Sequence, residues 1–346
     1  MKLIIFFFTV QILNDISVFM KTIVFFGGGE LLISIIDALH RFKYDKIFIY
    51  TSKRHVNEKV RSNKRLKNFL IKKKCNFIVK NELKISEIKA RFNFKKIICI
   101  SVGSPWLFNS NFIKKLKYNI YNIHGSDLPV GRGGGGFTWQ ILQEGFFGYI
   151  SIHQLSSGID KGNIIFKEKF NRKNCKSPLE FQKIYIKKAT ILFMKFFKKI
   201  IKNKKIMGKK QNEKISTYWP RLNTQLHGWI NWDWNAEEIY KFIKAFSDPY
   251  LGAHTTINNK IVYVKECELE KTKKFHPFQS GLVYRKDNKN LFISAKNGSL
   301  LVKKIFDKNG NSIQKNFIKL GDRFFTPNKK LEEAKKKRIF YNQKSN

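Results

Sequence analysis

Short apolar runs alternate with mixed, helix-like stretches over the first half of the chain. Runs rich in β-branched and aromatic residues lie at 22–26, 46–51, 76–80, 96–101 and 118–122. Helix-like segments separate them, one starting at Glu30 and a basic one over 58–74. Because strands that alternate with helices pair in parallel, this pattern predicts an α/β fold with an open, mostly parallel twisted sheet. Gly27–Gly29 fits a tight strand-to-helix turn better than a nicotinamide site, since GGGE is not GxGxxG.

The pattern changes after about residue 205. A helix over 137–144, strands over 148–155 and 163–168, and a long helix over 177–202 complete the first domain. After a helix over 235–247 come short strands near 253–257, 260–267, 281–285, 290–294 and 299–305, which predict a small OB-like β-barrel. We therefore divide the chain into an extension or mis-assigned start (1–19), a catalytic domain (20–205), a linker (206–220), the barrel domain (221–326) and a basic tail (327–346).

The apolar segment 3–13 near the N-terminus resembles the core of a signal peptide. It is too short to span a bilayer, and no small-x-small cleavage site follows it. The four cysteines lie far apart without a CxxC pair, which argues against a disulfide framework or a zinc ribbon. The sequence thus predicts a cytoplasmic protein with reduced thiols, no metal and no membrane contact.

The net charge of +43 comes from 68 cations and 25 anions. Only 11 of the cations are Arg, although Arg is the residue that reads bases and phosphates with two parallel hydrogen bonds. Lys, Asn, Ile and Phe, whose codons are rich in A and T, are abundant together. Compositional drift and a dedicated polyanion-binding face both remain open as explanations of the charge.

The residues with the clearest chemistry follow the 118–122 run. Asn122 and His124 are two apart, so in an extended strand both side chains point the same way, and Asp160 follows in a Gly-flanked loop. An amide, an imidazole and a carboxylate suit attack on an acyl carbon, because they can hold the carbonyl, stabilise an oxyanion and accept a proton. The alternative is structural, with Asn122 capping the loop and His124 satisfied within the core. His153 is interpreted as structural, and His254 as structural or at the surface.

The wider string NIHGSDLPVGRGGGG, followed by WQIL and SSGIDKG, resembles the family of formyltransferases that use 10-formyltetrahydrofolate. The matching residues are Asn122, His124, Ser126, Leu128, Pro129, Arg132, Gly133, Asp160 and Gly162. Asp127 stands where the family usually has Leu, and Gly134–Gly136 replaces an Ala-Pro region. The similarity covers about residues 20–326, including HGWINW and AFSDPYLGAHT in the second domain.

The resemblance implies an enzyme in which Asn122 holds the formyl oxygen, His124 acts as acid and oxyanion stabiliser, and Asp160 orients His124 and helps remove the amine proton. It also implies a folate donor, 10-formyltetrahydrofolate, as co-substrate, and no metal. The donor contacts that it implies are Trp106, Leu107, Phe108, Ser126, Asp127, Leu128, Pro129, Ser156, Ser157, Gly158 and Ile159.

The acceptor amine has two main candidates within the resemblance. Methionyl-tRNA formyltransferases usually carry a Pro/Gly/Arg-rich insertion after the second strand, whereas residues 51–70 here contain no Pro or Gly. That difference and the GSDLPVGRG variant favour a nucleotide-linked amino sugar, with Gly134–Gly136 allowing its amine to approach closely. The full-length second domain and the basic charge favour initiator methionyl-tRNA. A non-catalytic nucleic-acid-binding relative is the alternative of another class.

Overall fold

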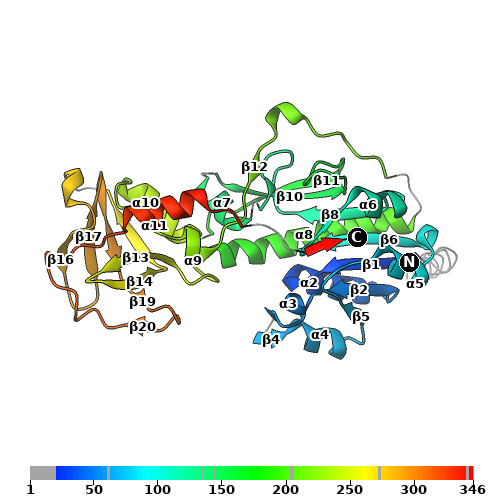
Figure 1. The fold of residues 1–346 in the computed structure, drawn as a ribbon, viewed down its shortest axis with the longest axis horizontal. Helices are drawn as coiled ribbons and strands as arrows, with labels where there is room; N and C mark the ends of the chain where they lie inside the picture. The colour runs from blue at the N-terminus through cyan, green and yellow to red at the C-terminus, as the bar shows by residue number, and fades with distance from the viewer. Residues whose placement is uncertain are drawn as a thin grey trace, which may run out of the picture.

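The computed structural model describes residues 21–60, 63–134, 136–143, 145–175, 177–202, 206–271, 274–339 and 343–345. These residues form two lobes, with the long helix α8 in the first lobe and the second lobe rich in short strands (Figure 1). The predicted extension over 1–19 lies outside the described residues.

The first lobe is built on a seven-stranded sheet with the order β11-β10-β8-β6-β1-β2-β5. The strands are β1 (Thr22–Gly27), β2 (Ile47–Thr51), β5 (Asn76–Val79), β6 (Ile97–Val102), β8 (Ile120–His124), β10 (Phe147–Gln154) and β11 (Ile164–Asn171). The five strands from β8 to β5 pair in parallel, while β10 is antiparallel to both β8 and β11. The predicted open, mostly parallel sheet is therefore confirmed.

Helices cover both faces of this sheet. One face packs on α2 (Gly29–Arg41), α4 (Leu66–Lys72) and α8 (Pro178–Ile201), and the other on α5 (Ile85–Arg91) and α6 (Ser110–Lys115). Helix α8 begins where Ser177 accepts a hydrogen bond from the Glu180 N–H at 3.2 Å and Pro178 occupies the first turn. Its buried stripe includes Phe181, Phe193 and Phe197, and apolar burial of this kind is the main source of stability in such a layered fold.

The second lobe contains two four-stranded antiparallel sheets around its own core. Their orders are β13-β14-β19-β20 and β15-β18-β17-β16, with bounds Ala253–Ile257, Lys260–Val264, Ile305–Phe306, Ser312–Ile313, Cys267–Glu270, Gly298–Val302, Leu291–Ala295 and Val283–Lys286. Helix α10 (Ala236–Ala245) starts at Asn235, whose side chain accepts from the Glu238 N–H at 2.9 Å, and it buries one face against these sheets.

Several short elements position the site or join the lobes. They are α3 (Lys53–Val56), β3 (Lys59–Val60), β4 (Lys64–Arg65), η2 (Phe94–Lys96), β7 (Trp106–Phe108), β9 (Arg132–Gly133), α7 (Phe137–Leu142), η3 (Glu213–Ile215), β12 (Tyr218–Trp219), α9 (Thr224–His227), η4 (Pro277–Gln279), α11 (Asn328–Lys336) and β21 (Gln343–Ser345). Strand β12 pairs with β9, so the linker runs alongside the glycine-rich loop. Strand β21 pairs in parallel with β7.

The single basic helix predicted over 58–74 is wrong. The structure has the two-stranded β3–β4 hairpin and then the shorter helix α4. The buried side chains Val60, Leu66 and Leu70 do not share one continuous helical stripe with the basic residues before them. Local basic composition favours a helix, but burial of these three side chains decides the fold of the segment.

The four cysteines are free and sit in different parts of the molecule. Cys75, Cys99 and Cys175 belong to the first lobe and Cys267 to the second. Burial raises the pKa of the Cys75 thiol to about 11 and that of the Cys267 thiol to about 12. Burial also raises the pKa of Cys99, which lies in the middle of β6. These thiols therefore remain protonated near neutral pH.

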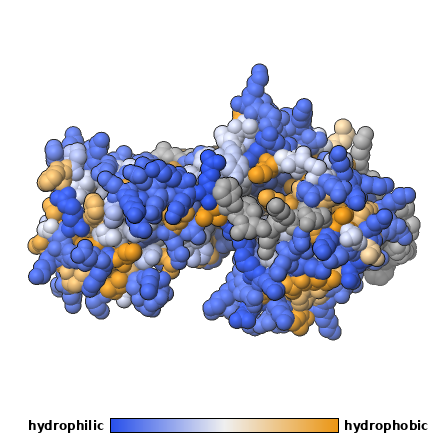
Figure 2. All heavy atoms as spheres, in the orientation of Figure 1, coloured by the Kyte–Doolittle hydropathy of each residue, from blue (hydrophilic) through white to orange (hydrophobic). Residues whose placement is uncertain are grey.

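The visible face of the molecule is mostly hydrophilic, including the surface over α11, with scattered apolar residues (Figure 2). Among the residues that the structure describes, no helix is both long enough and apolar enough to cross a membrane.

Candidate active site

Asn122 and His124 lie at the carboxyl end of β8, near the middle of the sheet. Alternation along the strand places both on the same face, while Ile123 points into the core between them. The His124 Nε2 atom lies 3.0 Å from the Gly131 carbonyl oxygen, so this nitrogen is the one that donates a proton there. The other ring nitrogen, Nδ1, faces Asp160 Oδ2 at 3.8 Å.

Asp160 reaches the same place from the loop between β10 and β11. Its Oδ2 atom accepts a hydrogen bond from the Gly133 N–H at 2.9 Å, and its Oδ1 atom accepts from Asn122 Nδ2 at 3.5 Å. Burial alone raises the pKa of this carboxyl, but the neighbouring histidines and the Gly133 N–H outweigh it and hold the pKa well below its ordinary value. Asp160 is therefore a carboxylate in the working pH range, and the structure brings the three predicted catalytic residues together.

His153 is a fourth polar member of this cluster. It is fully buried on β10 opposite Asn122, with Nε2 3.2 Å from Asn122 Nδ2 and 3.4 Å from Asp160 Oδ1. Its Nδ1 atom donates to the Gln154 carbonyl at 3.1 Å. The sequence predicts only a structural role for His153; its place beside Asn122 comes from the antiparallel pairing of β8 and β10, which the sequence does not show. The β10–β11 register also shifts at this residue, next to the Asp160 loop.

The loop that follows His124 and the loop that carries Asp160 are both hydrogen-bonded to the linker. The Arg132 guanidinium is buried and donates to Gln211 Oε1 at 2.8 and 3.2 Å and to the Glu213 carboxylate at 2.8 and 2.9 Å. Gln211 Nε2 in turn donates to the Asp160 and Gly162 carbonyls, both at 2.7 Å. The linker thus forms part of the support of the site.

A cavity of about 290 Å³ opens beside the catalytic cluster; we call it the central cavity. Its walls include Asn122, His124 and Asp160, and also the β7 segment and the loop before Asp160. Seven of the predicted donor contacts line it: Trp106, Leu107, Phe108, Ser156, Ser157, Gly158 and Ile159.

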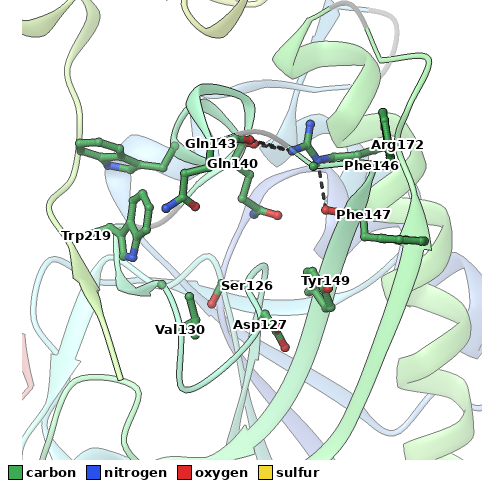
Figure 3. A pocket seen from close by; sticks show the side chains of 13 residues that line it. Ser126, Asp127, Val130, Gln140, Gln143, Phe146, Phe147, Tyr149, Arg172 and Trp219 are labelled. Atoms are coloured by element: carbon green, nitrogen blue, oxygen red, sulfur yellow. Dashed lines mark hydrogen bonds between the residues drawn. The ribbon is translucent and has the colours of Figure 1, made fainter. Parts of the chain in front are cut away.

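The other four predicted donor contacts lie elsewhere on the loop that follows His124. Leu128 and Pro129 are buried, whereas Ser126 and Asp127 line a separate cavity of about 210 Å³, which we call the α7–β10 cavity (Figure 3). Lys167 forms an ion pair with Asp127 and donates to the Leu128 carbonyl at 3.0 Å, which fixes the loop between the two cavities.

A third cavity, of about 360 Å³, lies on the side of the glycine-rich segment; we call it the glycine-loop cavity. His124, Gly134, Trp139, Arg221 and Tyr250 are among its lining residues. A Cβ atom on Gly134 would lie 2.5 Å from the Arg221 backbone, so this glycine is required for the close approach of the linker. Gly134 therefore has a packing role, in addition to the predicted role of letting the acceptor amine approach.

No group of three or more His, Cys, Asp or Glu side chains that could hold a metal ion occurs in the part of the chain that the structure describes. The candidate site consists of an amide, two imidazoles and a carboxylate around a cavity. These groups can bind a carbonyl oxygen, donate a proton to a developing oxyanion and accept a proton from an amine.

Comparisons with known proteins agree with this chemistry. Residues 223–319 match the family described as "Formyl transferase, C-terminal domain". The methionyl-tRNA formyltransferase of Rickettsia massiliae is 30% identical over 216 residues, which cover 62% of this chain and 67% of that protein.

Two solved structures share the fold. WlaRD, a sugar 3N-formyltransferase crystallised with dTDP and 5-N-formyl-THF, has a TM-score of 0.61 at 20% identity, covering 82% of this chain and 97% of its own. The N-formyltransferase of Helicobacter canadensis, in complex with folinic acid and dTDP-3-aminofucose, has a TM-score of 0.61 at 19% identity, covering 83% and 100%.

The fold and the site define an enzyme that transfers a one-carbon acyl group. The chain belongs to the formyltransferase family, as the sequence resemblance predicted. This membership supports an enzyme rather than a non-catalytic nucleic-acid-binding relative.

Proposed function

We propose that this enzyme transfers a formyl group from 10-formyltetrahydrofolate to the primary amine of a nucleotide-linked amino sugar. Asn122, His124 and Asp160 are the catalytic residues of the proposal. The observation that carries it is their convergence on the wall of the central cavity, with the carboxylate of Asp160 held ionised beside the His124 imidazole.

The central cavity is the proposed donor site. Trp106, Phe108 and the segment Ser156–Ile159 line it together with backbone polar groups, and a flat pterin with polar edges suits such a wall. A donor seated there would present its formyl group to the end of β8. Ser126–Pro129 would then act by holding the loop beside the formyl group rather than by enclosing the pterin.

The proposed reaction is an addition followed by elimination. The acceptor amine attacks the formyl carbon, and Asn122 Nδ2 and the His124 imidazole donate hydrogen bonds to the oxygen as it gains charge. For this, the hydrogen bond that His124 Nε2 donates must shift from the Gly131 carbonyl to the formyl oxygen. Asp160 accepts the amine proton, and the bond from the formyl carbon to N10 breaks as N10 takes the proton of His124 Nε2. The proton on Asp160 Oδ2 passes to His124 Nδ1, which faces it at 3.8 Å, so the carboxylate and the neutral imidazole are both restored. One C–N bond forms and one breaks, and the oxidation state of the formyl carbon does not change.

The stretch after β2 supports a small acceptor. The described part of 53–72 forms α3, the β3–β4 hairpin and α4. Val56, Val60 and Leu66 in these elements are buried, so the segment packs on the first lobe. A loop that reads an acceptor stem would have to project from the surface. A compact basic segment contacts phosphates without identifying a base pair.

Initiator methionyl-tRNA is the second candidate acceptor. The specific observation in its favour is the 30% identity to a methionyl-tRNA formyltransferase, together with the match of residues 223–319 to the C-terminal domain family.

A competition assay distinguishes the two. The full chain, limiting in amount, is given labelled 10-formyltetrahydrofolate and equal concentrations of a UDP- or dTDP-linked amino sugar and initiator methionyl-tRNA, at physiological salt. We expect label in the sugar product, and tRNA binding that is weak, independent of tRNA identity and strongly reduced by salt. Selective formylation of initiator over elongator methionyl-tRNA would replace the proposed acceptor and leave the donor chemistry intact.

A further inference from the structure

The α7–β10 cavity, on the far side of the Ser126–Gly131 loop from the central cavity, has the composition of a binding site for an aromatic ring. Five aromatic side chains surround it: Trp139, Phe146, Phe147, Tyr149 and Trp219. In Figure 3 Trp219 stands at one side, Tyr149 and Phe147 at the other, and Gln140 and Gln143 above the loop. Walls of this kind stack on flat, conjugated ligands.

One polar group in the cavity has no partner in the described chain. Ser126 is 4% exposed, and its Oγ atom makes no hydrogen bond within the part that the structure describes. A buried hydroxyl without a partner costs free energy, whereas a ligand edge that donates and accepts would satisfy it. Gln140 and Gln143 line the same cavity. Gln140 Nε2 donates to the Gly125 carbonyl at 2.5 Å, so the Gln140 amide oxygen and the Gln143 amide are the further groups for such an edge.

The mouth of the cavity is both apolar and positively charged. Phe146 is 58% exposed and Phe147 is 44% exposed, and each ring has an ammonium group above it, Lys173 at 5.3 Å and Lys169 at 4.9 Å. A neutral aromatic ligand would gain only a cation–π attraction from these cations. An aromatic ring that carries anionic groups would gain from both features.

The cavity is also connected to the reacting centre. Gly131, which lines it, accepts the hydrogen bond from His124 Nε2 at 3.0 Å. Trp139 lines both this cavity and the glycine-loop cavity, where His124 and Arg221 are exposed to a ligand. Trp139 is thus a wall common to the two cavities, so a subsite in one adjoins a subsite in the other.

We propose that the α7–β10 cavity is the subsite for the base of the nucleotide-linked acceptor. The base stacks among Phe146, Tyr149 and Trp219, its polar edge pairs with Ser126 and the two glutamine amides, and the diphosphate lies among the surrounding cations. This inference rests on the proposed function, since it assigns a place to one part of that acceptor.

The test is direct binding of nucleoside diphosphates to the full chain. UDP, dTDP, CDP, ADP and GDP are titrated by calorimetry into the wild type and into Phe146→Ala, Ser126→Ala and Phe278→Ala. Phe278 is the matched control, since its ring is exposed and has the Arg323 guanidinium above it at 5.3 Å, but it lies in the second lobe. Circular dichroism verifies that each variant is folded.

We expect at least one nucleoside diphosphate to bind. Phe146→Ala should weaken that binding by about tenfold or more, the scale of a lost stacking ring. Ser126→Ala should weaken it by roughly threefold to tenfold, the scale of one hydrogen bond, and Phe278→Ala should leave it unchanged.

The outcomes distinguish a failure of the proposed base subsite from a failure of the proposed acceptor. Formylation of a nucleotide-linked amino sugar, with nucleotide binding unchanged in Phe146→Ala and Ser126→Ala, would overturn this subsite and keep the proposed function. Absence of any nucleoside diphosphate binding, with formylation of methionyl-tRNA alone, would overturn both. Binding that the two variants weaken, without formylation of any nucleotide-linked amine, would support the subsite and remove the proposed acceptor.

Discussion

The charge of Asp160 organises the site at the scale of single residues. Its carboxylate lies within 4 Å of both His124 and His153 and accepts the Gly133 N–H. Because its pKa is held well below the ordinary value, the carboxylate is ionised at every pH at which the enzyme is expected to work. The acidic limb of a pH–rate profile should therefore arise from groups other than Asp160.

His124→Ala should lower kcat by a factor on the order of 10² or more, the scale of a lost acid or oxyanion donor. The side chain lies on the wall of the central cavity and contributes little to the core, so the midpoint of unfolding should change little. Steady-state formyl transfer and a denaturant titration of the same purified variant check both statements. Near-normal turnover would contradict the assigned role.

Gly162→Ala should disturb the loop that presents Asp160. A Cβ atom there would lie 1.7 Å from the Gln154 carbonyl oxygen, so the backbone must move. We expect a loss of roughly 1–3 kcal/mol in the free energy of unfolding, as for other overpacked positions, and a large loss of kcat. Gly310→Ala is the control, because its Cβ would meet nothing within 4 Å and only its positive φ is strained. Equal effects of the two substitutions would refute this account.

Asn122, His124 and Asp160 can be predicted from the sequence as site residues, because a two-residue spacing on a strand and a Gly-flanked loop are local features. The place of His153 in the cluster cannot be predicted in this way, because it depends on which strand lies beside β8. The separation of Ser126 and Asp127 from the central cavity also lies beyond the sequence, since the path of their loop is fixed by tertiary contacts such as the Lys167–Asp127 ion pair.

At the scale of elements, the linker before β12 acts as a clamp: it holds together the loop that follows His124 and the loop that carries Asp160. Gln211 is buried and bridges Arg132 of the His124 loop and two carbonyls of the Asp160 loop. Strand pairing of β12 with β9 adds backbone hydrogen bonds to the same contact. Movement of the linker is therefore expected to move Asp160.

Gln211→Ala should cost about 1–3 kcal/mol of unfolding free energy, because it leaves buried hydrogen-bonding groups without partners. It should also lower kcat more than it raises KM for the donor, since Asp160 loses its support while the walls of the central cavity remain. Gln314→Ala, at an exposed position of the second lobe, is the matched control. If Gln211→Ala lowers stability but leaves kcat unchanged, the clamp has only a structural role.

Most long elements followed their sequence patterns, because each has its own apolar periodicity and start signal. Helix α8, with Ser177 and Pro178 at its start, and the fully buried strand β6 are examples. The short elements β7, β12 and β21 could not be predicted, since two or three residues carry no periodicity. Pairing with distant segments alone makes them strands.

At the scale of the whole molecule, each lobe buries a histidine in neutral form. In the first lobe, burial first and then the nearby Arg54 and Arg221 charges lower the pKa of His55 to about 4. In the second lobe, burial lowers the pKa of His254 to about 4. In the unfolded chain both would titrate at their ordinary pKa of 6.5.

The free energy of unfolding should therefore fall as the pH decreases from about 6.5 to about 4. Over this range the unfolded chain binds protons that the folded chain does not, and each histidine contributes up to roughly 3 kcal/mol of lost stability. Denaturant titrations at several pH values measure the slope, and His55→Gln and His254→Gln should each reduce it. A wild-type profile that is flat from pH 7 to 4.5 would contradict the prediction.

Two of the four protonated thiols make the two lobes separately observable: Cys99 is buried in the first core, and Cys267 is half-buried against the second. A protonated cysteine enclosed in a core reacts with an alkylating reagent only when the surrounding structure opens. Cys99 in β6 thus reports the opening of the first lobe, and Cys267 in β15 that of the second. Pulse labelling followed by mass spectrometry would time the two events on one unmodified chain. Simultaneous labelling would indicate a single cooperative unit held by the linker, and two distinct times would indicate lobes that open independently.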